Sequence, residues 1–348
     1  MSLKHTASLL LLALGALSLN TSTSTSFQTV QPAFTSILGQ HPEINLLVEN
    51  ESYPFAHEAP VYIPSTGDLF VAGNWKTPTG GQPIQVSRIV NNRNNSYTRE
   101  LITPDIPNAN GAINYRDGIL FCAQGTIERP SALIFMNITP PYNTETLLDN
   151  FHGRRFNSLN DLVVHSDGSI WFTDPTYGYD QDFTPEPDLP NQVYRFDPAT
   201  GDVRAVADGI GQPNGIALSP DGSVLYVTDT DASWGNGDSS TRRAATIYAF
   251  DIQYYSGAPF LTNKRVFAFV DTGIPDGIKC DTEGNVYSGC GDGIHVHSPG
   301  GVLLGKIVLP GVAANLAFAR PGELFALNEH RLWKVRLDRG VRGSLLGL

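Results

Sequence analysis

The chain has 348 residues, of which 41% are hydrophobic, and carries a formal net charge of −11 at pH 7. This charge disfavours nucleic acids and anionic membrane surfaces as partners, because both are themselves negatively charged. The 34 glycines and 24 prolines separate apolar runs instead of clustering, which indicates an ordered chain with many turns.

Residues 1–20 have the pattern of a secretory signal peptide. Lys4 and His5 precede an apolar run over residues 7–19 that is too short to span a bilayer comfortably. An uncleaved membrane anchor is the alternative interpretation. Residues 21–40 begin with a Thr-Ser repeat, and we expect a flexible N-terminal segment there. Asn-x-Ser/Thr sequons for N-glycosylation lie at Asn20, Asn50, Asn94 and Asn137. In a eukaryotic host, these sequons and the signal peptide would make the chain a secreted, extracellular glycoprotein.

Six segments of the chain repeat one pattern. Each has a polar residue, an apolar run, a turn that in most of them contains glycine, and a second apolar run, which is typical of a β-hairpin. No convincing amphipathic helix of ten residues interrupts them, so the pattern favours an all-β fold. The segments cover residues 58–74, 109–125, 156–175, 212–230, 274–290 and 314–328.

The polar residues that lead the six segments recur at steps of 52, 50, 54, 62 and 39 residues. A period of roughly 40–50 residues, with several short strands in each unit, is typical of a β-propeller with one blade per repeat. We therefore predict a six-bladed β-propeller over residues 41–339, followed by a tail at 340–348. The leading residues are Glu58, Asn110, Asn160, Asn214, Asp276 and Asn315.

Further expectations concern the ends, the loops and the cysteines. The strand-like run at 44–48 should pair with residues 332–337. β-Propellers commonly close their ring of blades by pairing a strand from one terminus with the last blade. Three polar loops, at 74–81, 179–190 and 231–243, are the best candidates for a lid or a substrate rim. We expect the cysteines to be buried and unpaired. They are Cys122, Cys280 and Cys290.

Residues at one equivalent place in every blade face one mouth of the channel, so the leading side chains should converge on a central-channel metal site. The carboxylates of Glu58 and Asp276 and the amide oxygens of Asn160 and Asn214 form a set of hard oxygen donors. Such ligands suit Ca²⁺; Mg²⁺ and Mn²⁺ fit less well, and Zn²⁺ would be expected to bring histidine or cysteine. Alternatively, these residues only satisfy backbone groups at the strand starts. Asn110 fits that alternative better and could simply line the channel.

Three neighbours of the leading residues are also candidates. His57 precedes Glu58, and strand alternation would point it to the other face, as a supporting or core histidine rather than a base. Asp161 is expected to support the site from behind. Arg155 could hold substrate hydroxyls or a product carboxylate, or could be a surface residue. Together with Asn110, Arg155 and His57 are the candidate substrate residues.

Four short motifs connect the repeats to a known family: HEAPV at 57–61, RFNSLND at 155–161, PNG at 213–215 and PDG at 275–277. With these motifs, residues 41–339 resemble the gluconolactonase / senescence-marker-protein / luciferin-regenerating-enzyme family of six-bladed propellers. Residues 140–148 and 287–301 look like its secreted fungal lactonohydrolases, which open D-pantolactone and aldonate lactones. The resemblance implies a catalytic Ca²⁺ bound by Glu58, Asn160, Asn214 and Asp276.

The implied reaction is hydrolysis of a small-molecule lactone, in which the cation stabilises the oxyanion. The nucleophile is either a water activated by Asp276 or Glu58 or a carboxylate that attacks directly, and we favour water. With Asn160, these residues are the catalytic candidates. No GxSxG motif indicates a serine hydrolase. Alternatives are a phosphotriesterase of the diisopropylfluorophosphatase–paraoxonase type, a strictosidine-synthase-like propeller, which would lack the acidic ligands, and a non-catalytic binding propeller.

Overall fold

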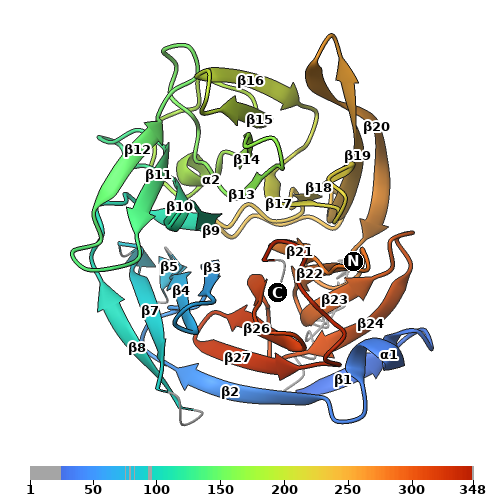
Figure 1. The fold of residues 1–348 in the computed structure, drawn as a ribbon. Helices are drawn as coiled ribbons and strands as arrows, with labels where there is room; N and C mark the ends of the chain where they lie inside the picture. The colour runs from blue at the N-terminus through green and yellow to red at the C-terminus, as the bar shows by residue number, and fades with distance from the viewer. Residues whose placement is uncertain (1–24, 75, 78–79, 82, 93–95, 347–348) are drawn as a thin grey trace, which may run out of the picture.

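The computed structural model describes residues 25–346 except 75, 78–79, 82 and 93–95. In this part of the chain, six sheets of antiparallel strands surround a central axis (Figure 1). The predicted all-β, six-bladed propeller is therefore confirmed. The predicted signal peptide and the sequons at Asn20 and Asn94 lie outside the described residues. No helix among the described residues is long and apolar enough to cross a membrane.

The first three blades each contain four strands that follow one another in the sequence. Blade 1 consists of β3 (Glu58–Ile63), β4 (Asp68–Ala72), β7 (Val86–Asn91) and β8 (Tyr97–Ile102). Blade 2 consists of β9 (Ala109–Tyr115), β10 (Gly118–Ala123), β11 (Ala132–Asn137) and β12 (Thr144–Leu148). Blade 3 consists of β13 (Leu162–Val164), β14 (Ile170–Asp174), β15 (Gln192–Asp197) and β16 (Asp202–Ala207).

Blade 4 also contains four consecutive strands, which are β17 (Pro213–Leu218), β18 (Val224–Asp229), β19 (Thr246–Tyr255) and β20 (Ala258–Phe269).

Blades 5 and 6 each include one strand from the N-terminal part of the chain. Blade 5 consists of β21 (Ile278–Cys280), β22 (Val286–Cys290), β23 (Gly293–His297), β24 (Leu303–Val308) and β1 (Ser26–Thr29). Blade 6 consists of β25 (Asn315–Phe318), β26 (Glu323–Asn328), β27 (Arg331–Arg336) and β2 (Glu43–Glu49).

The first strand of each blade lies nearest the axis, and consecutive first strands contact one another around the ring (Figure 1). The second strand of each blade is the second apolar run of its repeat, and these strands are buried between neighbouring sheets; β10 and β14 are buried along their whole length. Trp171 and Phe172 of β14, for example, are fully buried in a cluster that joins blades 2, 3 and 4. The hydrophobic core is therefore a ring of layers between blades, and the axis remains available for polar groups.

The ring is closed by N-terminal strands. β2 pairs with β27, with Ile44 opposite Val335, which confirms the predicted closure. A second contact was not predicted: β1 pairs with β24 as a fifth strand of blade 5. Between them, helix α1 (Phe34–Leu38) buries Phe34 and Ile37 in the core of blades 5 and 6. The segment 21–40 was expected to be flexible, but its described part is instead ordered by this pairing and burial.

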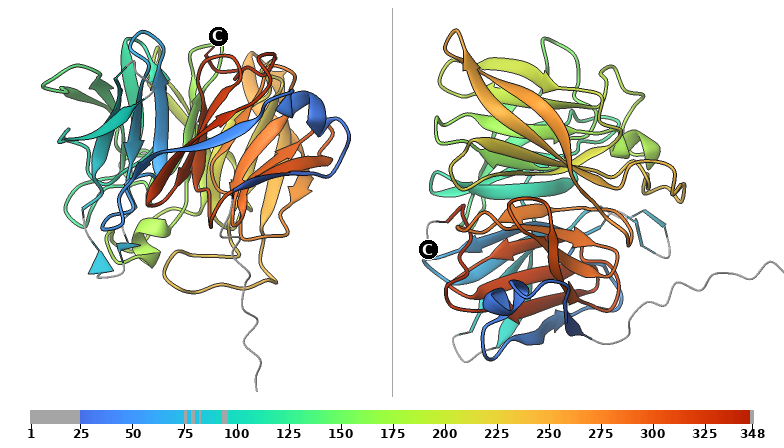
Figure 2. Two further views of the ribbon diagram at one scale, coloured as in Figure 1. Left: turned by 90° about the horizontal axis from the view of Figure 1, so that it is seen from below. Right: turned by 90° about the vertical axis from the view of Figure 1, so that its right-hand side faces the viewer.

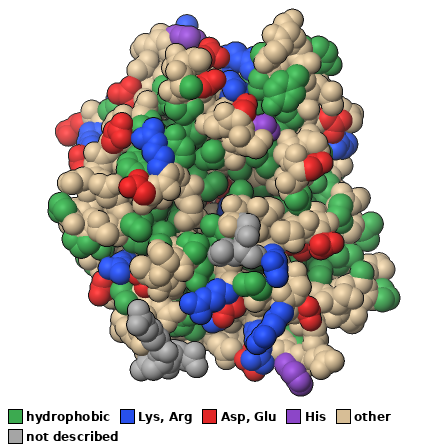
Figure 3. All heavy atoms as spheres, in the orientation of Figure 1, with side chains coloured by type: hydrophobic (Ala, Val, Ile, Leu, Met, Phe, Trp, Pro, Cys, Tyr) green, Lys and Arg blue, Asp and Glu red, His purple; other side chains and the backbone are tan. Residues whose placement is uncertain are grey.

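The loops and the C-terminal tail lie on opposite faces of the ring. Helix α2 (Tyr177–Asp180), the hairpin of β5 (Lys76–Thr77) and β6 (Gly80–Gly81), and the loop after β18 project from one face (Figure 2). The C-terminus lies on the other face, where hydrophobic side chains line a central hollow (Figure 3). There the tail pairs back onto blade 5, since the N–H of Ser344 donates to the carbonyl of Cys280 at 3.0 Å. The three cysteines are buried and unpaired, as predicted.

Candidate functional site

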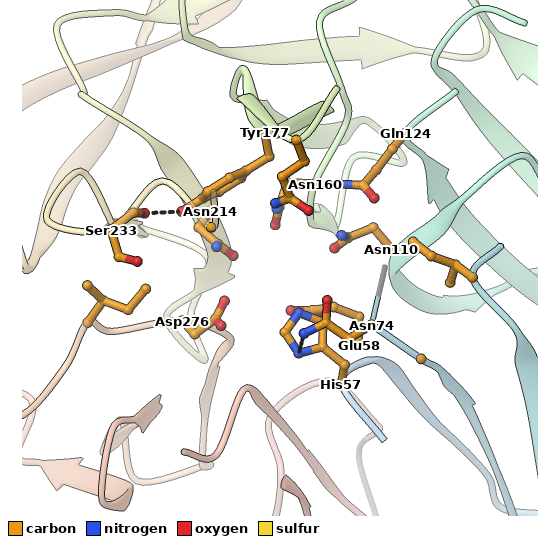
Figure 4. Close-up of a pocket in the computed structure, with 15 residues that line it drawn as sticks. His57, Glu58, Asn74, Asn110, Gln124, Asn160, Tyr177, Asn214, Ser233 and Asp276 are labelled. Atoms are coloured by element: carbon orange, nitrogen blue, oxygen red, sulfur yellow. Dashed lines mark hydrogen bonds between the residues drawn. The ribbon is translucent and has the colours of Figure 1, made fainter. Parts of the chain in front are cut away.

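A polar cavity of about 170 Å³ occupies the channel mouth on the face that carries the loops. Glu58, Asn160, Asn214 and Asp276 all line it, although they come from four different blades (Figure 4). Asn110 lines the same cavity. All five side chains are at least nine-tenths buried. The structure thus brings together the residues that lead five of the six repeats.

Glycines allow the inner strands to approach one another at this level of the channel. A Cβ atom on Gly215 would lie 2.4 Å from the carbonyl oxygen of Asp276, and one on Gly277 would lie 2.1 Å from Cγ of Asn315. Real Cβ atoms do not tolerate such distances, so only glycine fits these two places. The Asn-Gly and Asp-Gly pairs of the repeats are therefore explained by close packing between neighbouring blades.

The Thr-Asp pairs that end the second strands hold the leading residues in place. Thr173 Oγ1 donates a hydrogen bond to the carbonyl oxygen of Asn214 at 2.6 Å, and Thr228 Oγ1 donates to that of Asp276 at 2.9 Å. Each threonine thus fixes the backbone of the next blade. The carboxylate of Asp174 accepts two backbone N–H groups from the segment before β13, at 3.0 and 2.9 Å. These bonds satisfy the backbone and leave the leading side chains directed into the cavity.

Two carboxylates face each other across the cavity. One ligand atom from each of Glu58, Asp276 and His57 lies within 4.8 Å of the other two. Burial, together with the charge of Asp276, raises the pKa of Glu58 well above its usual value, while a hydrogen bond from Asn315 at 2.6 Å opposes this rise. Burial raises the pKa of Asp276 to about 6. Two buried carboxylates at this separation disfavour each other's charge, so a cation between them would stabilise both.

One amide oxygen in the same cavity has no hydrogen-bond partner among the described residues. Oδ1 of Asn160 is buried, and no donor among the described residues reaches it. Leaving a buried acceptor unpaired costs about 1–3 kcal/mol, so such an atom is usually explained by a bound ion or water. With the oxygens of Glu58, Asn214 and Asp276, it forms a hard donor set that fits a divalent cation. His57 adds a ring nitrogen beside this set, which the sequence did not predict.

His57 lies on the cavity wall, not on the opposite face of the strand. The expected alternation fails because the register of β3 with β4 shifts between Glu58 and Val61, and Ala59 has a φ of 54°. Nδ1 of His57 lies 2.8 Å from Oε1 of Glu329. Burial alone would lower the pKa of His57, but the charge and hydrogen bond of Glu329, together with the charges of Glu58 and Asp276, outweigh burial and raise the pKa to about 10.

The remaining wall of the cavity consists mainly of amide and hydroxyl side chains. Asn74, Gln181 and Ser233 come from the three loops that the sequence predicted as a lid or substrate rim, and the structure shows that all three loops border the cavity. The hydroxyl of Tyr177 in α2 donates to the carbonyl of Ser233 at 3.1 Å and contacts Thr230, which ties two of these loops together (Figure 4). Such a wall offers many hydrogen-bond donors and acceptors to a polar ligand.

Two other predicted residues lie outside the cavity. Asp161 is buried behind the site, where Nζ of Lys279 lies 3.5 Å from its Oδ2. Arg155 does not line the cavity: its guanidinium donates to the backbone carbonyls of residues 126, 127 and 129 at 2.8, 3.1 and 2.7 Å. This position argues against the predicted role of Arg155 in substrate binding. The arginine instead anchors the loop between β10 and β11.

Sequence reasoning missed a second repeated position that also faces the cavity. Asn74 comes two residues after β4, Gln124 one residue after β10, and Glu329 one residue after β26. Asn74 and Gln124 line the cavity, and Glu329 contacts it through His57. A polar residue directly after the second apolar run of a repeat would have been the signal. Tyr177 lies outside the six repeated segments, so no repeat pointed to it.

The chain is similar in sequence and in structure to known proteins. Residues 58–325 match the SMP-30/Gluconolactonase/LRE-like region. Lactonohydrolase oryL of Aspergillus oryzae is 34% identical over 90% of this chain and 74% of its own length. A gluconolactonase of Zymomonas mobilis is 32% identical over 66% of this chain and 63% of its own length. The solved structure of a gluconolactonase from Xanthomonas campestris, 28% identical, has a TM-score of 0.70 and covers 89% of this chain and 94% of its own.

Proposed function

The chain belongs to the SMP-30/gluconolactonase/LRE-like family, and on this basis we propose that it hydrolyses lactones with a bound divalent cation. The ligands are Glu58, Asn160, Asn214 and Asp276. The observation that carries the proposal is the convergence of these oxygen donors on one cavity, with Oδ1 of Asn160 left without a protein partner. We propose Ca²⁺ as the cation, because it accepts carboxylate and amide oxygens in an irregular shell.

The cation and the two carboxylates have different roles in the proposed reaction. A cation bound here supplies polarisation of the lactone carbonyl and a lowered pKa for water. Asp276, whose carboxylate faces the cavity, accepts the proton of the attacking water as the general base. Glu58 is held in one orientation by Asn315. We favour water over direct carboxylate attack, because both carboxylates are committed to holding the cation.

The substrate that suits this cavity is a small lactone with several hydroxyl groups, such as an aldonolactone or D-pantolactone. The wall supplies amides from Asn74, Asn110, Gln124 and Gln181. Each amide both donates and accepts hydrogen bonds, as vicinal hydroxyls require. A site built to bond hydroxyl groups discriminates strongly against analogues that lack them, because its own polar groups are then left unpaired.

The experiment is pH-stat hydrolysis of D-glucono-δ-lactone and D-pantolactone, with and without a chelator. We expect at least one of them to be hydrolysed, the activity to vanish in chelator, and added Ca²⁺ to restore it better than Mg²⁺ or Mn²⁺. Activity that survives full removal of metal would overturn the cation's role. Turnover of a phosphotriester but of neither lactone would favour the phosphotriesterase alternative, and no turnover of any substrate would favour a binding propeller.

We also propose that the protein is exported and glycosylated. The support is the sequence of residues 1–20 together with the sequons at Asn50 and Asn137, which are partly exposed in the structure. Secretion by the native host, with removal of the leader detected by mass spectrometry of the mature protein, tests this. An intact leader on protein that stays with the cells would contradict it.

A further inference from the structure

The loops around the channel mouth differ greatly in length from blade to blade. Blades 3 and 4 connect their second and third strands by long loops, at 175–191 and 230–245. Blades 5 and 6 connect the same strands by only two residues each, at 291–292 and 329–330. The two long loops project from this face of the ring (Figure 2). Together they form a wall beyond the strand ends of blades 3 and 4, which we call the loop wall.

Tyr177 joins the two loops of this wall through its hydroxyl group. The hydroxyl contacts Oγ1 of Thr230 and donates to the carbonyl oxygen of Ser233 at 3.1 Å. Tyr177 and Thr230 are both more than nine-tenths buried, so water competes little for these bonds. The loops also meet at a second place, where a Cβ atom on Gly235 would lie 2.6 Å from Nε2 of Gln181. All of these residues except Thr230 line the cavity, so the junction of the loops is part of its wall.

Helix α2, which begins with Tyr177, is anchored to blade 4. Nε2 of Gln212, the residue before β17, donates to Oγ1 of Thr176 at 3.1 Å and to Oδ2 of Asp180 at 2.9 Å. Oγ1 of Thr176 donates to the same carboxylate oxygen at 3.0 Å. Residues at both ends of α2 are therefore bonded to the start of the next inner strand. Tyr177 has a fixed position, and its hydroxyl holds the loop of blade 4 against it.

The loop wall faces the side chains that we expect to bind the hydroxyl groups of the substrate. Asn74, Asn110 and Gln124 come from blades 1 and 2, across the cavity from Ser233 (Figure 4). A lactone whose hydroxyls next to the carbonyl bind these amides turns the other side of its ring toward the wall. That side carries the ring oxygen and the substituted carbon beside it. In D-glucono-δ-lactone the substituent is a single hydroxymethyl group.

We propose that Tyr177 is a specificity-determining residue: by holding the loop 230–245 in place, it limits the substituent beside the ring oxygen to a small group. This inference rests on the proposed lactone hydrolysis and adds a size limit to it. Lactones that carry a second sugar at this position are excluded, because the loop wall occupies the space which that sugar needs. Without the hydroxyl, the loop of blade 4 moves away from α2 and larger lactones enter.

The test compares D-glucono-δ-lactone with melibiono-δ-lactone, which has the same ring and a galactosyl group on the hydroxymethyl oxygen. The acyl carbon and the leaving oxygen are the same in both, so the ratio of their kcat/KM values reports the effect of the substituent. Wild type should prefer D-glucono-δ-lactone by about 100-fold or more. Tyr177→Phe keeps the ring and removes only the hydroxyl. It should lower kcat/KM for the small lactone and raise it for the large one, so that the preference falls by about tenfold or more.

A second variant shortens the wall without changing Tyr177. Ser233 and Ser239 form an antiparallel bridge, so residues 234–238 can be replaced by Asn-Gly, which suits a two-residue hairpin. This variant should also gain activity on melibiono-δ-lactone. Tyr194→Phe is the matched control, because its hydroxyl donates to Oε1 of Gln192 at 2.8 Å and the residue does not line the cavity. It should keep the wild-type preference.

The outcomes separate the size limit from the proposed function. Equal wild-type kcat/KM values for the two lactones, or a parallel fall of both in Tyr177→Phe, would overturn the role of Tyr177 and leave lactone hydrolysis intact. A wild type that opens D-pantolactone alone has a lower limit, and both variants must then gain D-glucono-δ-lactone hydrolysis. A wild type that opens none of these lactones would overturn the proposed function itself. If Tyr177→Phe does not fold, the shortened loop decides.

Discussion

Nδ2 of Asn315 lies 2.6 Å from Oε2 of Glu58, and this hydrogen bond connects the inner strand of the last blade to that of the first. Oδ1 of Asn315 in turn accepts the N–H of Leu316 at 2.8 Å, so the amide presents its donor to Glu58. A residue 257 positions further along the chain therefore orients one proposed cation ligand.

Replacing Asn315 by alanine should weaken cation binding by about tenfold or more, because a hydrogen bond to a charged group contributes about 1.5–3 kcal/mol. Isothermal titration with Ca²⁺ measures this. The matched control is Asn328→Ala in the same blade, whose amide bonds the backbone carbonyls of Pro310 and Val312. The control should lose stability but keep its cation affinity. Equal affinities in both variants would contradict the role of Asn315.

Cation removal should lower the thermal stability. A cation present at about 100 times its dissociation constant stabilises the native state by about 2.7 kcal/mol, and a chelator removes this term. Calorimetric melting with and without chelator measures it. Asn160→Ala should reduce the difference, because it deletes the unpartnered oxygen.

Asn110→Ala is the control for this experiment. Asn110 lines the same cavity, but its Oδ1 already accepts the N–H of Gly111 at 2.9 Å. We therefore expect the chelator to lower the melting temperature of the Asn110→Ala variant as much as that of the wild type. A wild type whose melting temperature is unaffected by chelator, at a Ca²⁺ concentration that supports activity, would argue against a cation at this site.

Gly277→Ala should destabilise the fold by about 1–3 kcal/mol and lower activity. The added methyl would lie 2.1 Å from Cγ of Asn315, so it must displace the residue that orients Glu58. Gly300→Ala is the control, since a Cβ there meets only Oγ of Ser298 at 3.8 Å. Urea denaturation and lactone turnover together measure both effects. A fully active Gly277→Ala variant would show that the inner strands can move apart without loss.

Stability should depend on pH through His295 in blade 5, whose Nε2 lies 2.7 Å from Oδ1 of Asp292. Burial alone would lower the pKa of His295, but Cys290 and Asp292 outweigh it and raise the pKa to about 9. Because the folded-state pKa lies above the usual 6.5, the stabilisation is complete below pH 6.5 and is lost as the pH rises through 9. His295→Gln should therefore be less stable than wild type at pH 6, and the gap between their urea midpoints should narrow by pH 10. A gap that stays constant would exclude this linkage.

The fold could be predicted because its signals are local and repeated. Each hairpin has two apolar runs around a turn, and the six leading residues mark the blades without any knowledge of contacts. The family resemblance and the pairing of 44–48 with the last blade are confirmed. β1 escaped prediction because its sequence, SFQT, is short and mostly exposed, and its partner β24 lies at the other end of the chain.

The site could be predicted only where it follows the repeat. The convergence of Glu58, Asn160, Asn214 and Asp276 follows from the equivalence of blades. The position of His57 does not, because an irregular strand start breaks the alternation of side chains. Glu329 was overlooked because its role depends on a left-handed backbone and on a contact with a blade far away in sequence.

The pairing of β2 with β27 has a consequence for biosynthesis. Arg331 contacts Glu49 across a separation of 282 residues, so the strands that leave the ribosome first wait for nearly the whole chain before they find partners. Glu58 likewise gains Asn315 only when the final blade has been made. A nascent chain that stalls before its last blade would therefore hold most of its sheets but no competent cavity, and turnover would begin only with the completed polypeptide.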